Sequence, residues 1–311
     1  MKHPYHQKVS FAIGTGRCGT KFLYQLFQKE NGVASHHERH PLSDTFQRYC
    51  QWNQLPVDTA GFLAQKEEGI RQDLSKYTHS FEASAYLSLS VLPLYEQFDA
   101  KFVFLVRSPH KVVNSYLQKH WYDQPVYRTN PQLAAGFQPG MKEPHHSFSR
   151  LVPRGEEAER WVHYTQVGKL AWFWRTINDA IQKQFASLPD THHMTIRIED
   201  FNFQKYQEVC DFLEYPQTHS AAAFEKLTSS KPNRLYSRRT VADWSEQARE
   251  EFEQEVATLS KHWGYPWQTA PLIAKEEKQE TKQPAPWRVK YQQLRKDLQL
   301  RKKLIQFLER H

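Results

Sequence analysis

The stretch from Val9 to Leu23, VSFAIGTGRCGTKFL, is an apolar strand followed by a glycine-rich turn and the first residues of a helix. This succession constrains the fold, because a buried strand that turns tightly into a helix is the building unit of α/β proteins. The unpaired N–H groups at the start of such a helix, together with its dipole, attract anions. We therefore expect a cradle for a phosphate or sulfate group. The plainer alternative is a connection in which the glycines merely permit a tight turn.

Two nucleotide-binding motifs match this turn in part. Three glycines fit the dinucleotide pattern G-x-G-x-x-G: Gly14, Gly16 and Gly19. An acidic residue, Glu38, follows at roughly the distance of about twenty residues that this pattern requires. The P-loop pattern G-x-x-x-x-G-K-[ST] fails at its end, because Thr20 and Lys21 stand in reversed order and the lysine leaves the helix about 100° from its usual direction. The turn by itself leaves the kind of ligand open.

The 311-residue length allows one large α/β domain or two modest ones. The chain has three scattered cysteines, too few for a disulfide framework: Cys18, Cys50 and Cys210. This scarcity indicates a reducing compartment. The polar first residues, MKHPYHQKVS, contain no run long enough for a signal peptide or a membrane span. We expect a soluble, cytoplasmic protein.

The net charge of +8 is concentrated near the C-terminus. Residues 271–311 carry eleven Lys and Arg against five Asp and Glu, so the preceding chain is close to neutral. That preceding part shows no zinc-finger, RNP or helix-turn-helix signature, and nucleic acid is therefore not the expected partner.

Short apolar runs alternate with helical patterns along the chain, which predicts an α/β fold with a mostly parallel central sheet flanked by helices. The expected strands lie at 8–13, 33–35, 80–83, 101–106 and 193–198. The expected helices lie near 19–30, 59–69, 86–98, 109–119, 158–186, 204–214 and 245–262.

Two further segments stand out by composition. Residues 120–157 are rich in Pro, Gly, His and aromatic residues, and a loop of this length is usually a lid or a binding loop. We expect residues 1–270 to form the α/β domain and residues 271–311 to form a polar linker and a basic amphipathic helix at 287–310. Docking of that helix on its own domain, self-association, and peripheral contact with a partner or an anionic membrane surface all remain open.

A second phosphate site is predicted in KFVFLVRSPHKVVNSY, residues 101–116. A buried strand ends at Arg107, Ser108 and Pro109 start a helix, and Ser115 follows two turns later. A guanidinium at the end of a strand and a hydroxyl on the neighbouring helix can converge on one phosphate. Taken alone, the segment also fits an ordinary strand and helix with a surface arginine.

Together these motifs resemble those of sulfotransferases. Arg17-Cys18-Gly19-Thr20 resembles the family's 5′-phosphosulfate loop, and Arg107 with Ser115 resembles its 3′-phosphate site. Residues 82–85, EASA, resemble its E-K-S-P segment, with alanine in place of lysine and of proline. Residues 195–201 and 238–244 resemble its R-Y-E-D-L and R-K-G-x-x-G-D-W segments, although both glycines of the second are replaced. The resemblance covers about residues 9 to 265.

The resemblance implies a P-loop-like sulfotransferase fold, with 3′-phosphoadenosine 5′-phosphosulfate as co-substrate and a hydroxyl or amine acceptor on a small molecule, glycan, lipid or peptide. The implied nucleotide-binding residues are Arg17, Cys18, Gly19, Thr20, Lys21, Phe22, Arg107, Ser115, Arg238 and Arg239. In this interpretation Gly16 has no special role. The alternatives are an inert nucleotide-binding or scaffold protein and, with less support, a P-loop kinase or a Rossmann dehydrogenase.

Glu38 is the candidate general base, because its place 21 residues after Arg17 resembles that of the catalytic glutamate in tyrosylprotein-type sulfotransferases. Alternative bases are His37, His79 and Glu82. Arg17 and Lys21 are expected to stabilise the charge of the leaving phosphate. We expect no metal at His36, His37 and His40, since Pro41 prevents their presentation on one helix and no further ligand cluster accompanies them.

Overall fold

The computed structural model describes residues 3–229 and 240–280, and the predicted basic helix at 287–310 lies outside this part. The chain folds into two compact units, residues 1–267 and 268–311. Within the second unit the described element is helix α12 (Thr269–Glu280). None of the described helices combines the length and apolar character that a membrane crossing requires.

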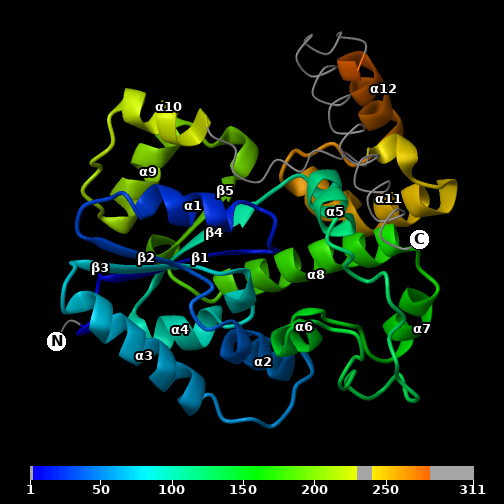
Figure 1. Cartoon of the computed structure of the whole chain (residues 1–311), viewed down its shortest axis with the longest axis horizontal. Helices are drawn as coiled ribbons and strands as arrows, with labels where there is room; N and C mark the ends of the chain where they lie inside the picture. Colours follow the sequence, from blue (N-terminus) through cyan, green and yellow to red (C-terminus); the bar gives the residue numbers. More distant parts are fainter. Residues whose placement is uncertain (1–2, 230–239, 281–311) are drawn as a thin grey trace, which may run out of the picture. The chain divides into compact units, whose positions relative to one another are not determined.

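The first unit contains a five-stranded sheet in which every strand is parallel to its neighbours, in the order β2-β3-β1-β4-β5 (Figure 1). Its strands are β1 (Val9–Gly14), β2 (Val33–His37), β3 (His79–Ala83), β4 (Lys101–Val106) and β5 (His193–Arg197). The predicted α/β class with a parallel central sheet is confirmed. Continuous apolar runs such as VSFAIG and KFVFLV arise because these strands are buried on both faces.

Twelve α-helices are described: α1 (Thr20–Phe27), α2 (Pro41–Trp52), α3 (Ala60–Leu74), α4 (Val91–Phe98), α5 (Pro109–Leu117), α6 (Pro144–Ser149), α7 (Glu156–Val162), α8 (Gln166–Phe185), α9 (Phe203–Leu213), α10 (Ala221–Ser229), α11 (Glu246–His262) and α12. Four 3₁₀ turns are described as well: η1 (Ala85–Leu87), η2 (Asp190–His192), η3 (Ile198–Asp200) and η4 (Val241–Asp243).

The sequence missed α2, α6, α10 and α12, the last of which begins in the domain and enters the expected linker, and it merged two helices. Helix α2 begins with Pro41, which has no N–H to leave unpaired and suits a first helical position. The single helix expected at 158–186 is two helices, because the Thr165 side chain accepts a hydrogen bond from Gly168 N and starts α8 separately from α7.

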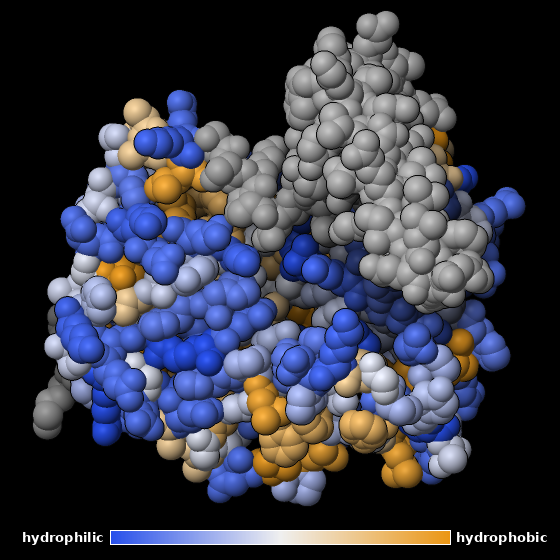
Figure 2. Space-filling model, in the orientation of Figure 1, coloured by the Kyte–Doolittle hydropathy of each residue, from blue (hydrophilic) through white to orange (hydrophobic). Residues whose placement is uncertain are grey.

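The two faces of the sheet are covered by different helices (Figure 1). Side chains of α1 and α9 pack on the face that carries Ala12, Val103 and Leu105. The alternate strand positions form an aromatic layer on the other face, where Phe102 and Phe104 contact Phe185 of α8. Figure 2 shows that hydrophobic side chains gather along the lower edge of the drawn face, while most of that face is hydrophilic.

Strand direction decides where a ligand can bind. Because all strands are parallel, their carboxyl ends share one edge of the sheet, where ligands bind in open α/β folds. The residues that leave the strands at this edge include Arg17, Glu38, Ser84 and Arg107. Three of the four are predicted site residues.

The packing of α8 on α11 provides a test of the fold. A Cβ at Gly168 would overlap the carboxylate of Glu251, which accepts hydrogen bonds from Thr165 N and Oγ1. We expect Gly168→Ala to lower the free energy of unfolding by about 1–3 kcal/mol in urea titrations. The matched control is Gly61→Ala in α3, where nothing lies within 4 Å and we expect a gain of up to about 1 kcal/mol. Equal stability of the two variants would contradict this packing.

Candidate functional site

The turn between β1 and α1 winds through three residues with left-handed backbone angles. Gly16, Arg17 and Gly19 have φ values of +79°, +56° and +116°. Gly19 is the N-cap of α1 and no side chain caps that helix. Gly19 therefore offers no side-chain oxygen to the start of α1, and the anion that the sequence predicted for this turn stays a prediction.

The close approach of other side chains to the turn explains why positions 16 and 19 are glycines. A Cβ at Gly16 would overlap the hydroxyl of Tyr116, which donates to Thr15 O at 2.6 Å. A Cβ at Gly19 would lie 2.8 Å from the side chain of Ile198. The expectation that Gly16 has no special role was therefore wrong, because a tyrosine from α5 occupies the space that its side chain would need.

The two predicted phosphate segments meet directly. Arg17 Nε donates to Ser115 Oγ at 2.8 Å, and Arg107 Nη1 donates to Arg17 O at 2.7 Å. The indole N–H of Trp174 donates to Arg107 O at 3.0 Å and holds the strand end in place. Residues about ninety positions apart thus form one polar site, and two guanidinium groups lie at its centre.

Glu199 and Trp244, which belong to two other predicted motif segments, form hydrogen bonds to α5 and its N-cap. The Glu199 carboxylate accepts from Ser108 N at 3.2 Å and from the Tyr265 hydroxyl at 2.9 Å. The Trp244 indole donates to Asn114 Oδ1 at 3.0 Å, one residue before Ser115. The predicted ligands Arg238 and Arg239 lie outside the described residues.

The remaining residues of the predicted nucleotide loop have different environments. Thr20 begins α1 and is buried, whereas Lys21 is exposed. Phe22 packs edge-on against Phe201 with ring centroids 5.4 Å apart. The Cys18 thiol is fully buried, and burial raises its pKa. Cys18 is therefore an uncharged core thiol, and a contribution to anion binding would come from its backbone N–H.

Glu38 follows β2 and has a left-handed backbone, with φ +50°. Its N–H donates to Ala83 O at 3.2 Å. Burial raises the pKa of the Glu38 carboxyl to about 7, although the charges of Arg48, Arg17 and Lys21 act in the opposite direction. The charges of Arg17 and Lys21 thus act on this carboxyl, and a pKa near neutrality suits a general base.

The alternative base His37 lies beside Glu38. Its Nδ1 is 3.8 Å from Glu38 Oε2. Burial and the charge of Lys21 lower the pKa of His37 to about 4, so its ring is neutral at physiological pH.

The alternative base Glu82 is committed to a buried ion cluster. Lys66 Nζ lies 2.9 Å from both Glu82 oxygens and 2.9 Å from Asp44 Oδ2, and all three side chains are at most 4% exposed. Glu82 Oε1 also accepts from Arg39 N at 3.1 Å. Glu82 therefore fixes the backbone immediately after Glu38 and has no free access to an acceptor.

His79, the third alternative base, begins β3 at the opposite edge of the sheet and packs on Tyr215 with ring centroids 5.0 Å apart. The predicted site residues are not near it. His36 bonds to Asp73 at 3.0 Å. Across residues 3–229 and 240–280, no three His, Cys, Asp or Glu side chains are grouped as metal ligands.

Arg48, which was not among the predicted site residues, is a buried cation whose charge acts on Glu38. Its side chain donates to Ala85 O at 3.1 Å and to Ser149 O at 2.6 Å, and its guanidinium lies 5.2 Å from the centre of the Tyr86 ring. Among the charged neighbours, Arg48 has the largest influence on the Glu38 carboxyl. No local sequence pattern marked Arg48, because α2 itself was not expected.

The buried ion cluster gives a testable expectation. Lys66→Met removes the cation between two buried carboxylates, and we expect the free energy of unfolding to fall by about 3–5 kcal/mol. Urea titration measures the change. Lys76→Met, at an exposed position, is the matched control and should change stability by less than about 0.5 kcal/mol. An unchanged stability of Lys66→Met would show that the cluster does not hold this edge of the sheet together.

No protein-family model matches the chain, and no curated protein matches it in sequence. Similar structures are known. Sulfotransferase STF9 from Mycobacterium avium has a TM-score of 0.53, covers 86% of this chain and 79% of its own, and is 11% identical.

Two sulfotransferase domains are also similar. The domain from the curacin biosynthetic pathway has a TM-score of 0.42 and 15% identity, over 83% of this chain and 98% of its own. The domain from the Synechococcus PCC 7002 olefin synthase has a TM-score of 0.46 and 13% identity, over 86% and 98%. With the topology described above, the similarity to STF9 shows that this chain has a sulfotransferase fold, as its motifs predicted.

Proposed function

We propose that the protein is a sulfotransferase that uses 3′-phosphoadenosine 5′-phosphosulfate. The observation that carries the proposal is the direct contact of the two predicted phosphate segments, through Arg17 Nε to Ser115 Oγ and Arg107 Nη1 to Arg17 O. A nucleotide with phosphates at both its 3′ and 5′ positions needs two such segments side by side. A dinucleotide enzyme has no use for the second one.

The residues at the site suit a highly anionic nucleotide. Arg17, Arg107 and Lys21 offer positive charge and hydrogen-bond donors without an acceptor on their side chains. The uncapped start of α1 adds backbone donors. The Ser115 hydroxyl accepts a hydrogen bond from Arg17, so the residues proposed for the 3′-phosphate lie directly beside those proposed for the 5′-phosphosulfate.

The bound co-substrate would supply the sulfuryl group, whose bond to the phosphate oxygen breaks as its bond to the acceptor oxygen forms. In this proposal the ionised carboxylate of Glu38 accepts the proton of the acceptor hydroxyl. Arg17 and Lys21 stabilise the electron pair that stays on the leaving phosphate. Because Arg17 does not readily release a proton, its contribution is electrostatic.

A kinase reaction has less support from this site. A P-loop kinase requires lysine directly followed by Ser or Thr, and an acidic residue for magnesium. The order Thr20-Lys21 and the strand end Val106-Arg107 provide neither.

The three cysteines are free and buried, which suits the cytoplasmic location that we also propose.

Nucleotide binding is the first test of the proposal. We expect 3′-phosphoadenosine 5′-phosphate to bind in calorimetry, and Arg107→Gln to weaken binding about tenfold or more, because a charge-assisted hydrogen bond contributes about 1.5–3 kcal/mol. Lys119→Gln removes an equal charge from an exposed position of the same region and should bind like the wild type. Absence of binding by the wild type at millimolar nucleotide would refute the proposal.

The second test concerns the base. With labelled sulfate and a panel of hydroxyl acceptors, we expect Glu38→Gln to lose about 10²–10⁴-fold in transfer rate and to keep its nucleotide affinity. Since the pKa of Glu38 is raised to about 7 and the ionised form is the active one, the wild-type rate should rise with pH up to about 7 and then level off.

The matched control for the base is Glu68→Gln, an exposed carboxylate on α3, which should keep the wild-type rate. Full activity in Glu38→Gln would assign proton transfer to another group. Nucleotide binding without transfer to any acceptor, in the wild type as well, would favour the inert nucleotide-binding protein.

A further inference from the structure

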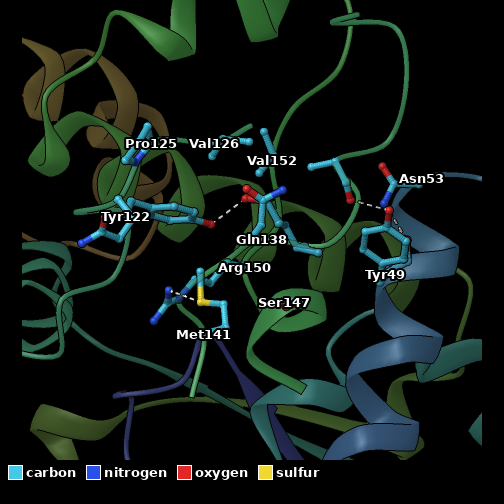
Figure 3. A pocket seen from close by; sticks show the side chains of 13 residues that line it. Tyr49, Asn53, Tyr122, Pro125, Val126, Gln138, Met141, Ser147, Arg150 and Val152 are labelled. Atoms are coloured by element: carbon cyan, nitrogen blue, oxygen red, sulfur yellow. Dashed lines mark hydrogen bonds between the residues drawn. The ribbon is translucent and has the colours of Figure 1, made fainter. Parts of the chain in front are cut away.

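The cavity between α2 and residues 120–157 is too small to hold a substrate (Figure 3). Its volume is about 20 Å³, which is room for about one water molecule. Two of its lining side chains bind the backbone of this segment. Tyr49 of α2 donates to Ala135 O at 2.5 Å, and Tyr122 donates to Leu151 O at 2.6 Å. The cavity is therefore part of the packing, and the feature that bears on the proposed reaction lies in α3.

Helix α3 contains two buried residues that are unfavourable at their positions in a helix. Gly69 lies in the helix interior, where glycine is less favourable than alanine. Asp73 lies in the last turn, where the helix dipole opposes a negative charge. Both residues contact the side chain of Arg39, which directly follows the candidate base Glu38. Packing against Arg39 therefore explains why α3 has a glycine and an aspartate at these positions.

The Arg39 side chain fills a socket on α3, which is formed by Gly69 and Asp73. A Cβ at Gly69 would lie 2.2 Å from Arg39 Nη1 and 3.2 Å from its Cδ and Cζ, so glycine leaves the room that the guanidinium needs. Arg39 Nη2 donates to Asp73 Oδ2, and the two side chains are 13% and 10% exposed. The loss of either partner would leave a buried charge uncompensated, so the pair holds the Arg39 side chain in place.

Asp73 binds the chain on both sides of Glu38. Its Oδ1 accepts from His36 Nε2 at 3.0 Å, and its Oδ2 also accepts from Ser80 Oγ at 2.6 Å. Although burial acts to raise the pKa of Asp73, these hydrogen bonds and the one from Arg39 lower it, so the carboxylate is charged at neutral pH. The residue two positions before Glu38 and the residue after it are thus attached to one ionised carboxylate.

The backbone between these two attachments is fixed as well. Glu38 N donates to Ala83 O at 3.2 Å, and Arg39 N donates to Glu82 Oε1 at 3.1 Å. Glu38 has φ +50°, a left-handed conformation that a residue other than glycine keeps only where its surroundings impose it. Strand β3 supplies the backbone contacts, and the Arg39 socket supplies the side-chain contacts from α3.

We propose that the Arg39 socket positions Glu38 for proton transfer, with Asp73 and Arg39 as positioning residues that act through the backbone of the base. The catalytic meaning of the socket rests on the proposed function. Its effect on the place of the Glu38 carboxyl can be measured without transfer.

Gly69→Ala and Asp73→Asn test the proposal independently, since the first displaces the Arg39 guanidinium and the second removes its charged partner. We expect each variant to lower kcat about ten- to a hundredfold, because a displacement of about 1 Å can lower a rate about a hundredfold. The affinity for 3′-phosphoadenosine 5′-phosphate should stay within about twofold of the wild type. The matched controls are Gly61→Ala, in the same helix with nothing within 4 Å, and Asp190→Asn, at an exposed aspartate. Both controls should keep the wild-type kcat.

Combination with Glu38→Gln separates positioning from a general loss of structure. In a protein without the base, Gly69→Ala and Asp73→Asn should leave the residual transfer rate unchanged within about twofold, because no carboxylate remains to be positioned. All variants are compared under conditions where urea titration shows them to be folded. A further tenfold loss in both double variants would overturn the positioning role, since a merely structural role would lower the residual rate as well.

The titration of Glu38, followed by carbon-13 NMR of its carboxyl, requires neither co-substrate nor acceptor. We expect a midpoint at about 7 in the wild type and in Gly61→Ala. In Gly69→Ala and Asp73→Asn the midpoint should fall toward the ordinary value of a glutamate, because a carboxyl that leaves its buried position regains water.

An unchanged midpoint in both socket variants would overturn the proposal, whatever the protein transfers. A lowered midpoint in the socket variants of a protein whose wild type transfers no sulfate would contradict the proposed function and leave the socket intact. Transfer by the wild type, with kcat unchanged in both socket variants, would contradict the socket alone.

Discussion

The hydrogen bond from Arg17 Nε to Ser115 Oγ, together with that from Arg107 to the Arg17 carbonyl, is the contact on which the site depends. It forms because β1 and β4 are parallel neighbours, with Gly14 opposite Leu105, so the turns after both strands leave the sheet at the same edge. Tyr116 on α5 then approaches the turn so closely that glycine is required at position 16. Two motifs far apart in sequence become one cationic site through sheet topology alone.

The candidate base depends on a second, buried layer of charge. Glu38 has a left-handed backbone, which is unfavourable for a residue other than glycine unless neighbours hold it. Glu82 provides this support by accepting the N–H of Arg39, and Lys66 in turn neutralises Glu82. Two effects on the pKa of Glu38 oppose each other. Burial favours the protonated carboxyl and nearby cations favour the carboxylate, and burial has the larger effect in the free protein. A group balanced in this way can both hold and release a proton near neutral pH.

Local signals sufficed for the strands, for the turn between β1 and α1 and for the strand end and helix start at residues 101–116, because strand burial and helix starts depend mainly on neighbouring residues. Local signals failed where residues distant in the chain determine the local structure. Helix α2 was missed, and with it Arg48, whose partners lie more than thirty residues away in the chain. Gly16 was undervalued because the atom that excludes a side chain there belongs to Tyr116. The predicted roles of Arg238 and Arg239 stay predictions, since these residues lie outside the described part.

A crystal structure with bound 3′-phosphoadenosine 5′-phosphate would test the central claim most directly. The account predicts that the 5′-phosphate lies on the backbone N–H groups at the start of α1, and that the 3′-phosphate contacts Arg107 and Ser115. Glu38 should then face the open side of the 5′-phosphate. A nucleotide bound elsewhere, or one whose 3′-phosphate lies away from both Arg107 and Ser115, would contradict the account.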